Sequence, residues 1–393
     1  MNTLLYLLLT LALLSIMVVI HELGHFLFAK LFRVTVLEFS VGMGPAIFTT
    51  KKTKRKENKE DGLGGELDIA TKFHHDQQLD TSALDVSEGE IAEYGKTIFS
   101  IRALPIGGYV SMAGEDDDSE DKNAFCHKPV WQRFIITVAG AVMNILLGIV
   151  CMFTLVGVES AQRGYLASTT IHSFQEGSTS NILSDSNLNP LMVGDTVIKV
   201  NGVRVHTGNE LVYEITNGGY KPVDLVVIRD GKEIVLEDVR FPSEQASGVT
   251  FGSYDFTVYG ETANFGTIMK HAVFRSFSTV KVIIDSLVDL VGGRYGAEAV
   301  SGPIGMAGAV GDAAQAGFTS ILYLFTLITM NLGVFNLLPF PALDGGRLVF
   351  LAIEGIFRKP VKKEIEQAIN TAGIMLLMAL MLFITVKDIF NLF

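Results

Sequence analysis

Long apolar runs dominate the pattern of this chain. A helix rises about 1.5 Å per residue, so roughly 20 consecutive apolar residues are needed to cross the hydrocarbon core of a membrane. Four stretches reach that length: Asn2 to about Phe32, Phe134 to Val158, a span inside the charge-free run Ala313 to Leu343, and Gln367 to Val386. The pattern therefore predicts a membrane α-helical bundle of four transmembrane helices.

Another apolar stretch, residues 268–293, carries charged side chains at intervals that a spanning helix would not tolerate. They are Lys270, Arg275, Lys281, Asp285 and Asp289. We expect this stretch to lie in the membrane interface or to pack on the bundle, within an amphipathic segment at 260–318.

Two regions show the two-residue alternation of β-strands. Residues 160–245 contain "VIKVNGVRV" and "VDLVVIRDGKEIVL", in which Asn-Gly and Asp-Gly pairs separate strand-like runs. Such pairs are typical of two-residue hairpin turns, and they predict a small α+β domain outside the membrane. Residues 95–115, with β-branched residues and a Pro-x-Gly-Gly turn, predict a membrane-associated β-hairpin on the cytoplasmic face.

Basic residues beside the apolar runs indicate the orientation of the chain, because Lys- and Arg-rich loops stay in the cytoplasm. These groups are "KKTKRKENKE" at 51–60, Lys128 with Arg133, and "RKPVKK" at 358–363. All three lie on one side if the N-terminus is outside and the chain crosses four times. The first run lacks a basic start and a small-residue cleavage site, so we expect a retained helix rather than a signal peptide.

The predicted organisation follows from these patterns. It comprises a first transmembrane helix (1–33), a cytoplasmic β region (34–130), a second transmembrane helix (131–158), the extracytoplasmic domain (160–245), the amphipathic segment (260–318), a third transmembrane region (319–357) and a fourth helix (367–390). Residues 51–94 are polar and acidic, as expected of a disordered insertion, and residues 115–121 form a second acidic loop.

Composition agrees with a multi-pass protein of the cell membrane. Of the 393 residues, 49% are hydrophobic and 19% charged, which is too apolar for an ordinary soluble enzyme. The net charge of -11 argues against nucleic acid as a partner, because phosphate binding needs clustered Lys and Arg. The two cysteines, Cys126 and Cys151, offer no disulfide framework and are expected to be packing residues.

The first apolar run ends in "HELGH". His21 and His25 are four residues apart, so on a helix they lie on one face and can share a metal ion, with Glu22 beside them. Zinc would lower the pKa of a bound water, and the carboxylate could accept its proton during attack on an amide. A chance match of the motif is the alternative. Ionisable groups inside a span are costly unless they are ligated or paired, which favours the metal site.

A third ligand is expected at membrane depth. Asp344 is the first acid after the charge-free run, and it follows Pro339 and Pro341, which interrupt the helix. Irregular backbone at that depth is tolerated only against protein or a wet cavity, so a helix that restarts at Gly345 would present Asp344 to that cavity. The alternative is that Asp344 only caps a helix near the interface.

With these motifs, the chain resembles the site-2 protease family of intramembrane zinc metalloproteases, in particular the bacterial branch typified by the regulator of sigma-E protease. Besides "HELGH", the matching stretches are "GAVMN" (140–144), "NLLPFPALDGG" (336–346), "LPIGGYVSMAGE" (104–115) and "SGPIGM" (301–306). The resemblance implies that His21, His25 and Asp344 bind zinc and that Glu22 is the general base. It also implies cleavage of single-span membrane proteins in regulated intramembrane proteolysis, with anti-sigma factors or signal-peptide remnants as substrates.

Further roles follow from the same resemblance. Asn144 and Asn336 are expected to bind the substrate backbone or the developing oxyanion, although an asparagine that bridges helices is almost as good an interpretation. The extracytoplasmic domain resembles a single PDZ module that contacts a substrate ectodomain or a cleaved C-terminus. Its Ser- and Asn-rich start leaves the peptide-binding groove open to question.

The hairpin around Gly107 and Gly108 could offer an edge strand to which an unwound substrate segment adds. Two other functions remain open at this point. A silent membrane scaffold would hold no zinc, and a metal transporter would move the ion across the bilayer. The transporter hypothesis is weakened because the sequence lacks the inverted repeat found in many transporters.

Overall fold

A computed structural model describes residues 3–50, 97–115, 119–182, 190–246, 249–294, 296 and 300–390. The acidic insertion expected at 51–94 and residues 116–118 of the second acidic loop lie outside the described residues. Both cysteines, Cys126 and Cys151, are free thiols and half-buried.

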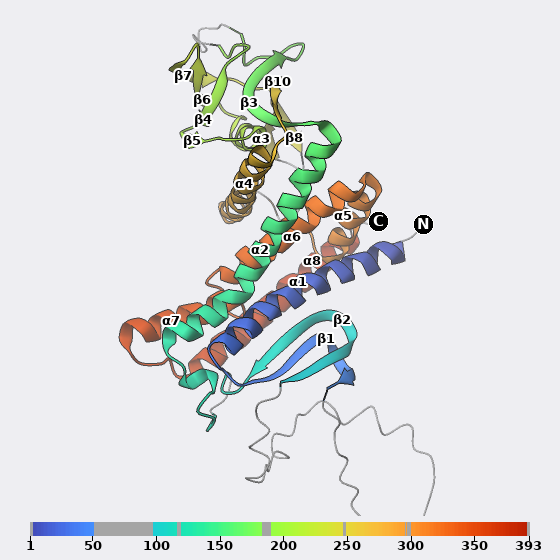
Figure 1. The fold of residues 1–393 in the computed structure, drawn as a ribbon, viewed down its shortest axis with the longest axis vertical. Coiled ribbons are helices and arrows are strands. Elements are labelled where there is room, and N and C mark those ends of the chain that lie inside the picture. Colours follow the sequence, from blue (N-terminus) through green and yellow to red (C-terminus); the bar gives the residue numbers. More distant parts are fainter. Residues whose placement is uncertain are drawn as a thin grey trace, which may run out of the picture. The chain divides into compact units, whose positions relative to one another are not determined.

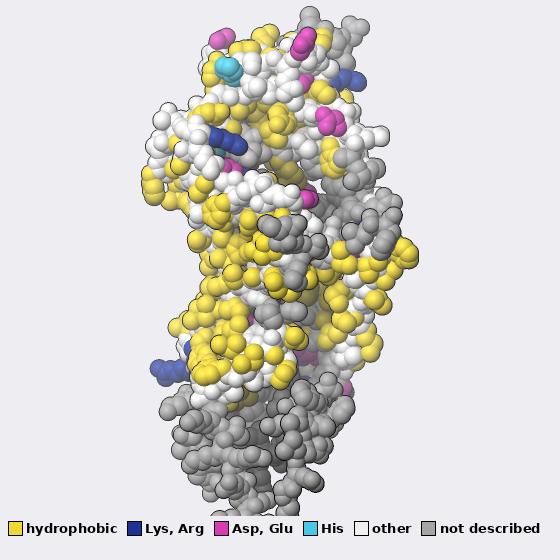
Figure 2. Space-filling model, turned by 90° about the vertical axis from the view of Figure 1, so that its right-hand side faces the viewer, with side chains coloured by type: hydrophobic (Ala, Val, Ile, Leu, Met, Phe, Trp, Pro, Cys, Tyr) yellow, Lys and Arg dark blue, Asp and Glu magenta, His cyan; other side chains and the backbone are white. Residues whose placement is uncertain are grey.

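Within the described residues, four helices are long and apolar enough to cross a membrane, and they coincide with the four predicted stretches. They are α1 (Thr3–Leu31), α2 (Val130–Arg163), α6 (Phe318–Leu337) and α8 (Lys363–Phe390). Figure 1 shows them as long rods, and Figure 2 shows hydrophobic side chains covering the surface over the helices, with few charged side chains among them. Apolar surface of this extent suits contact with lipid.

The chain divides into two compact units. Unit 1 comprises residues 1–6, 144–336 and 373–393, and unit 2 comprises residues 7–143 and 337–372. The hydrophobic core of unit 2 forms where the end of α1, the β-strands and the start of α2 meet. Its buried members are Ala29, Val34, Val36, Met112, Phe125 and Ile136.

The β-structure of unit 2 corrects the predicted hairpin. Residues Ile98–Met112 form a single bent strand, β2, which pairs with β1 (Val36–Thr49). The start of β1 lies beside both arms of β2, with Val41 opposite Gly108 and also opposite Ile101. Strand β1 lies within the predicted β region (34–130), but no individual strand was predicted there, because the insertion separates β1 from its partner in the sequence.

Unit 1 contains the predicted β-rich domain. The strands are β3 (Tyr165–Phe174), β4 (Thr196–Val200), β5 (Val203–Arg204), β6 (Val223–Arg229), β7 (Lys232–Val239), β8 (Ser243–Ala246), β9 (Val249–Gly252) and β10 (Phe256–Thr262). The main sheet has the order β10-β3-β4-β6-β7, with β5 paired to β4. Helix α3 (Gly208–Gly218) begins with a capping box formed by Thr207 and Glu210.

Both predicted hairpin turns are confirmed. Asn201 and Gly202 join β4 to β5, and Asp230 and Gly231 join β6 to β7, in each case with positive φ at both residues. This is the conformation whose twist matches that of the flanking strands. The core beneath the sheet contains fully buried aliphatic residues such as Ile171, Leu211, Leu225 and Leu236.

The segment predicted at 260–318 contains two helices, α4 and α5. Helix α4 (Phe265–Val291) packs through Ala272 on α2 and through Ile283 on α6. Helix α5 (Pro303–Ala316) starts within the "SGPIGM" motif, where buried Asp388 of α8 accepts hydrogen bonds from the amides of Gly302 and Gly305. The carboxylate thus caps the positive end of α5.

Candidate metal centre

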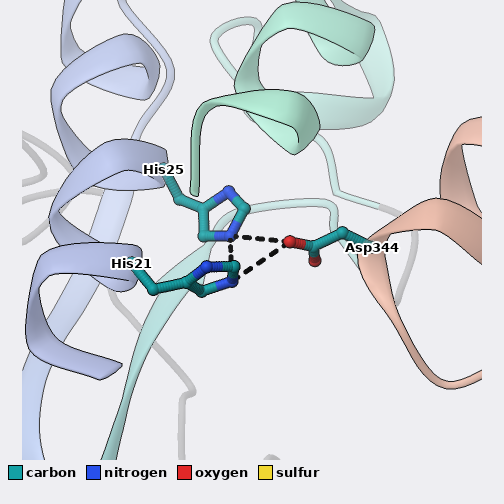
Figure 3. A group of neighbouring side chains, drawn as sticks. All are labelled: His21, His25 and Asp344. Carbon is teal, nitrogen blue, oxygen red and sulfur yellow. Dashed lines mark hydrogen bonds and ion pairs between the residues drawn. The ribbon is translucent and has the colours of Figure 1, made fainter. Parts of the chain in front are cut away.

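Helix α1 presents His21 and His25 on one face, as the four-residue spacing predicts. Their Nε2 atoms lie 3.2 Å apart and the rings meet edge to face, with centroids 4.8 Å apart. Both side chains are largely buried, with 11% and 12% exposed. Figure 3 shows both rings directed toward a carboxylate that comes from another element.

That carboxylate belongs to Asp344. Helix α6 ends at Leu337, and the proline-containing turn leads into α7 (Asp344–Phe357), which begins at the aspartate itself. The turn folds tightly over α7. It lies so close that a Cβ at Gly345 would be 1.9 Å from the carbonyl oxygen of Leu338. Asp344 Oδ2 lies 3.1 Å from His21 Nε2 and 3.3 Å from His25 Nε2.

The three atoms fit a zinc ion. Ligands about 2.0–2.2 Å from a tetrahedral zinc are separated by about 3.3–3.6 Å, close to the 3.1–3.3 Å found here. Asp344 Oδ2 is buried and receives no hydrogen bond of ordinary geometry within the described part of the chain. A cation would satisfy it. Two imidazoles and one carboxylate also form a donor set typical of catalytic zinc, which keeps one position open.

Neighbouring backbone orients the rings. His25 Nδ1 lies 2.9 Å from the carbonyl oxygen of Ile136 on α2, so the Nδ1–H group donates and the lone pair of Nε2 faces the other two ligand atoms. Helix α2 approaches closely because Gly140 has no side chain. A Cβ there would lie 2.3 Å from His25 Nε2 and 2.8 Å from His21 Cε1. The glycine of "GAVMN" thus provides the space for both imidazoles.

A cavity of about 210 Å³ adjoins the three ligand atoms, and we call it the metal cavity. Glu22 lines it together with the β2 residues Tyr109, Val110 and Met112. The amide of Val110 donates a hydrogen bond of 3.1 Å to Glu22 Oε2. The edge of β2 therefore reaches the carboxylate next to the ligands.

Polar contacts hold β2 in this position. Arg102 donates to Glu38 Oε1 at 2.9 Å and stacks on Tyr109, whose hydroxyl donates to Glu38 Oε2 at 2.7 Å. Burial, together with the hydrogen bond to Glu38 and the charge of Glu38, raises the pKa of Tyr109 to about 12, so its hydroxyl keeps its proton. No local sequence pattern marks Arg102 and Glu38 as partners, because only strand pairing brings them together.

The other predicted site residues have different positions. Gly107 has φ of +78°, and Gly108 is buried against the carbonyl oxygen of Ser40. Asn144 is fully buried in α2, where its main-chain oxygen lies 3.5 Å from Thr329 Oγ1, and Asn336 is half-buried in α6. Both asparagines belong to unit 1, and their contacts with substrate stay predictions.

Comparison with known proteins agrees with this chemistry. The sequence profile of peptidase family M50 matches residues 9–58 and 90–380. A Clostridium acetobutylicum protein provisionally named a zinc metalloprotease is 31% identical over 379 residues, which cover 95% of this chain and 94% of the relative. The zinc metalloprotease RasP of Geobacillus kaustophilus is 28% identical, with 95% of each chain covered. The regulator of sigma-W protease RasP of Bacillus subtilis is also 28% identical, with 96% of each covered.

Proposed function

Because this chain belongs to peptidase family M50, the site-2 family of zinc metalloproteases, we propose that it hydrolyses peptide bonds within or near the transmembrane segments of single-span membrane proteins. The observation that carries this proposal is the convergence of His21, His25 and Asp344 beside Glu22 in one cavity. In this proposal the first three residues hold the zinc ion and Glu22 is the general base.

The bound zinc would supply an activated water and polarise the scissile carbonyl. Glu22 accepts the proton of that water and later delivers it to the leaving nitrogen. The Val110 amide keeps one carboxylate oxygen in place during both transfers, which is supported by its 3.1 Å hydrogen bond to Oε2. The Ile136 carbonyl keeps His25 in the tautomer that binds metal.

The substrate segment would add to the edge of β2. A helix in lipid shelters its amides, so cleavage requires local unwinding, and an unwound segment needs new hydrogen-bond partners. The part of β2 that follows Gly107 and Gly108 lines the metal cavity through Tyr109 and Val110, which supports addition of an extended segment there. We propose that Asn144 and Asn336 bind the substrate backbone as well.

The orientation and the clients are further parts of the proposal. The basic groups next to the spans favour an N-terminus outside the cell and an active site toward the cytoplasm. One relative is named for the regulation of sigma-W, which favours anti-sigma factors as substrates, with signal-peptide remnants as a second class. The sheet with α3 would be a PDZ module that contacts the substrate ectodomain or limits its size.

The test uses the full chain in proteoliposomes with a fluorescent single-span peptide as substrate. Glu22→Gln should retain about one zinc per chain but lose about 10²–10⁴-fold in cleavage rate. The control Glu159→Gln makes the same change in another spanning helix, at a residue paired with Arg275, and should cleave normally. Full cleavage by Glu22→Gln would exclude the proposed base. A wild-type chain without zinc would favour a scaffold, and zinc flux without cleavage would favour a transporter.

A further inference from the structure

A second cavity adjoins the metal cavity. It has a volume of about 320 Å³, and we call it the vestibule. Its charged lining includes Arg133, Glu354, Lys363 and Glu366. Glu115 and Arg347 line both cavities, so this pair forms their common wall.

The pair joins the turn that follows β2 to α7. A guanidinium nitrogen of Arg347 donates to Glu115 Oε1, and a second one lies 3.4 Å from the carbonyl oxygen of Glu115. The side chains are 25% and 16% exposed, so both are largely desolvated. Arg347 follows Asp344 by three residues on the same helix, which places it on the same face as the proposed ligand.

Arg347 is the one lysine or arginine among the described residues that line the metal cavity. The carboxylates around it are Glu22, Glu115 and Asp344. Two imidazoles and one carboxylate would hold the zinc, and Glu22 would handle protons. The proposed roles therefore leave the Arg347 guanidinium without a function in the reaction.

Peptide hydrolysis creates a charge that needs such a cation. The C–N bond breaks and a C–O bond to water forms, so that one amide and one water become a carboxylate and, after proton uptake by the leaving nitrogen, an ammonium ion. Among side chains as largely buried as these, an uncompensated carboxylate is costly. Guanidinium pairs with carboxylate through two parallel hydrogen bonds, a geometry that lysine does not provide.

We propose that Arg347 is a product-binding residue that exchanges Glu115 for the new carboxylate and guides the fragment from the metal cavity into the vestibule. This inference rests on the proposed function. Before cleavage, Glu115 keeps the guanidinium at the wall. After cleavage, the product carboxylate competes with Glu115 for it.

If Arg347 exchanges Glu115 for the product carboxylate, its variants should behave differently from those of a purely structural ion pair. Removing Arg347 should weaken binding of a carboxylate product, whereas removing the charge of Glu115 should strengthen it, because the guanidinium loses its competitor. A structural pair would be damaged equally from either side, with a parallel loss of stability.

The experiment measures binding to the zinc-loaded full chain in detergent, so it does not depend on turnover. The probes are two forms of one apolar peptide, one ending in a free carboxylate and one in a carboxamide. The carboxylate form should bind more tightly to the wild type, and Arg347→Gln should reduce that preference about 10–100-fold. Glu115→Gln should raise it, and Arg347→Lys should give an intermediate value.

Arg275→Gln is the matched control. Arg275 is similarly buried and pairs with Glu159 at 2.7 Å, but it lines neither the metal cavity nor the vestibule. Its variant should keep the wild-type preference. An unchanged preference in Arg347→Gln, or equal losses in the Arg347→Gln and Glu115→Gln variants, would overturn the inference. Failure of the proposed function would show separately, as a wild-type chain that cleaves nothing.

Discussion

Replacing Gly140 with alanine tests the geometry of the metal centre without touching a ligand. The added Cβ would lie 2.3 Å from His25 Nε2, whereas ordinary van der Waals contact begins at 3.4 Å. The ring or the helix would have to withdraw by about 1.1 Å, and zinc–ligand distances tolerate only about 0.2 Å. The same Cβ would lie 2.8 Å from His21 Cε1, so both proposed imidazole ligands are displaced.

The expected result is a loss of zinc affinity. Changes to groups that only support a ligand weaken metal binding by 10–100-fold, and here the ligands themselves move. We expect at least a 100-fold higher dissociation constant, about 2.7 kcal/mol at 25 °C. Zinc bound by the purified full chain would be measured by mass spectrometry against a series of zinc buffers, with cleavage rate as a second readout.

Gly157→Ala is the matched control. It makes the same change in the same helix, and its Cβ would meet nothing within 4 Å. Zinc affinity should stay at the wild-type value, and the helix should gain roughly 1 kcal/mol from the better propensity of alanine. Wild-type zinc affinity in Gly140→Ala would refute the placement of the imidazoles against α2.

Three more predictions concern stability, measured as melting temperature in detergent. Ala342 has φ of +72° in the turn before α7, so Ala342→Gly should stabilise the chain by about 1 kcal/mol, and an unchanged or lower melting temperature would contradict the strain. Burial raises the pKa of Glu38, but hydrogen bonds from its neighbours outweigh it and lower the pKa below 4.5. The wild type should therefore melt at a higher temperature than Glu38→Gln above pH 4.5, and this difference should vanish as the pH falls through the folded-state pKa of Glu38. A difference in melting temperature that stays constant down to pH 3 would argue against this role of Glu38. Asp388→Ala leaves two amides at the start of α5 without their acceptor and should cost about 1–3 kcal/mol, which equal melting temperatures would disprove.

The sequence alone predicts those features of the structure that depend on a local pattern of residues. The four-residue spacing places His21 and His25 on one face of α1, and the paired turn residues form both hairpins of the β domain. Apolar length alone locates the four spanning helices. Each of these features depends on residues within one or two turns of each other.

Features that depend on contacts between distant segments were not available from the sequence. Strand β1 was not predicted as an individual strand, and β2 was given the wrong partner, because their register is decided across the intervening insertion. The ion pair of Glu115 and Arg347 joins residues 232 positions apart. No local pattern marks either residue as belonging to the metal cavity.

The motifs therefore determined which side chains could act, and the tertiary structure decided what surrounds them. The sequence contains two histidines and an aspartate, but only the packing of Gly140 against α1 and the tight turn before α7 bring three ligand atoms within 3.1–3.3 Å. The physical reason is that a helix fixes the direction of its own side chains, whereas the distance between elements is set by what fits between them.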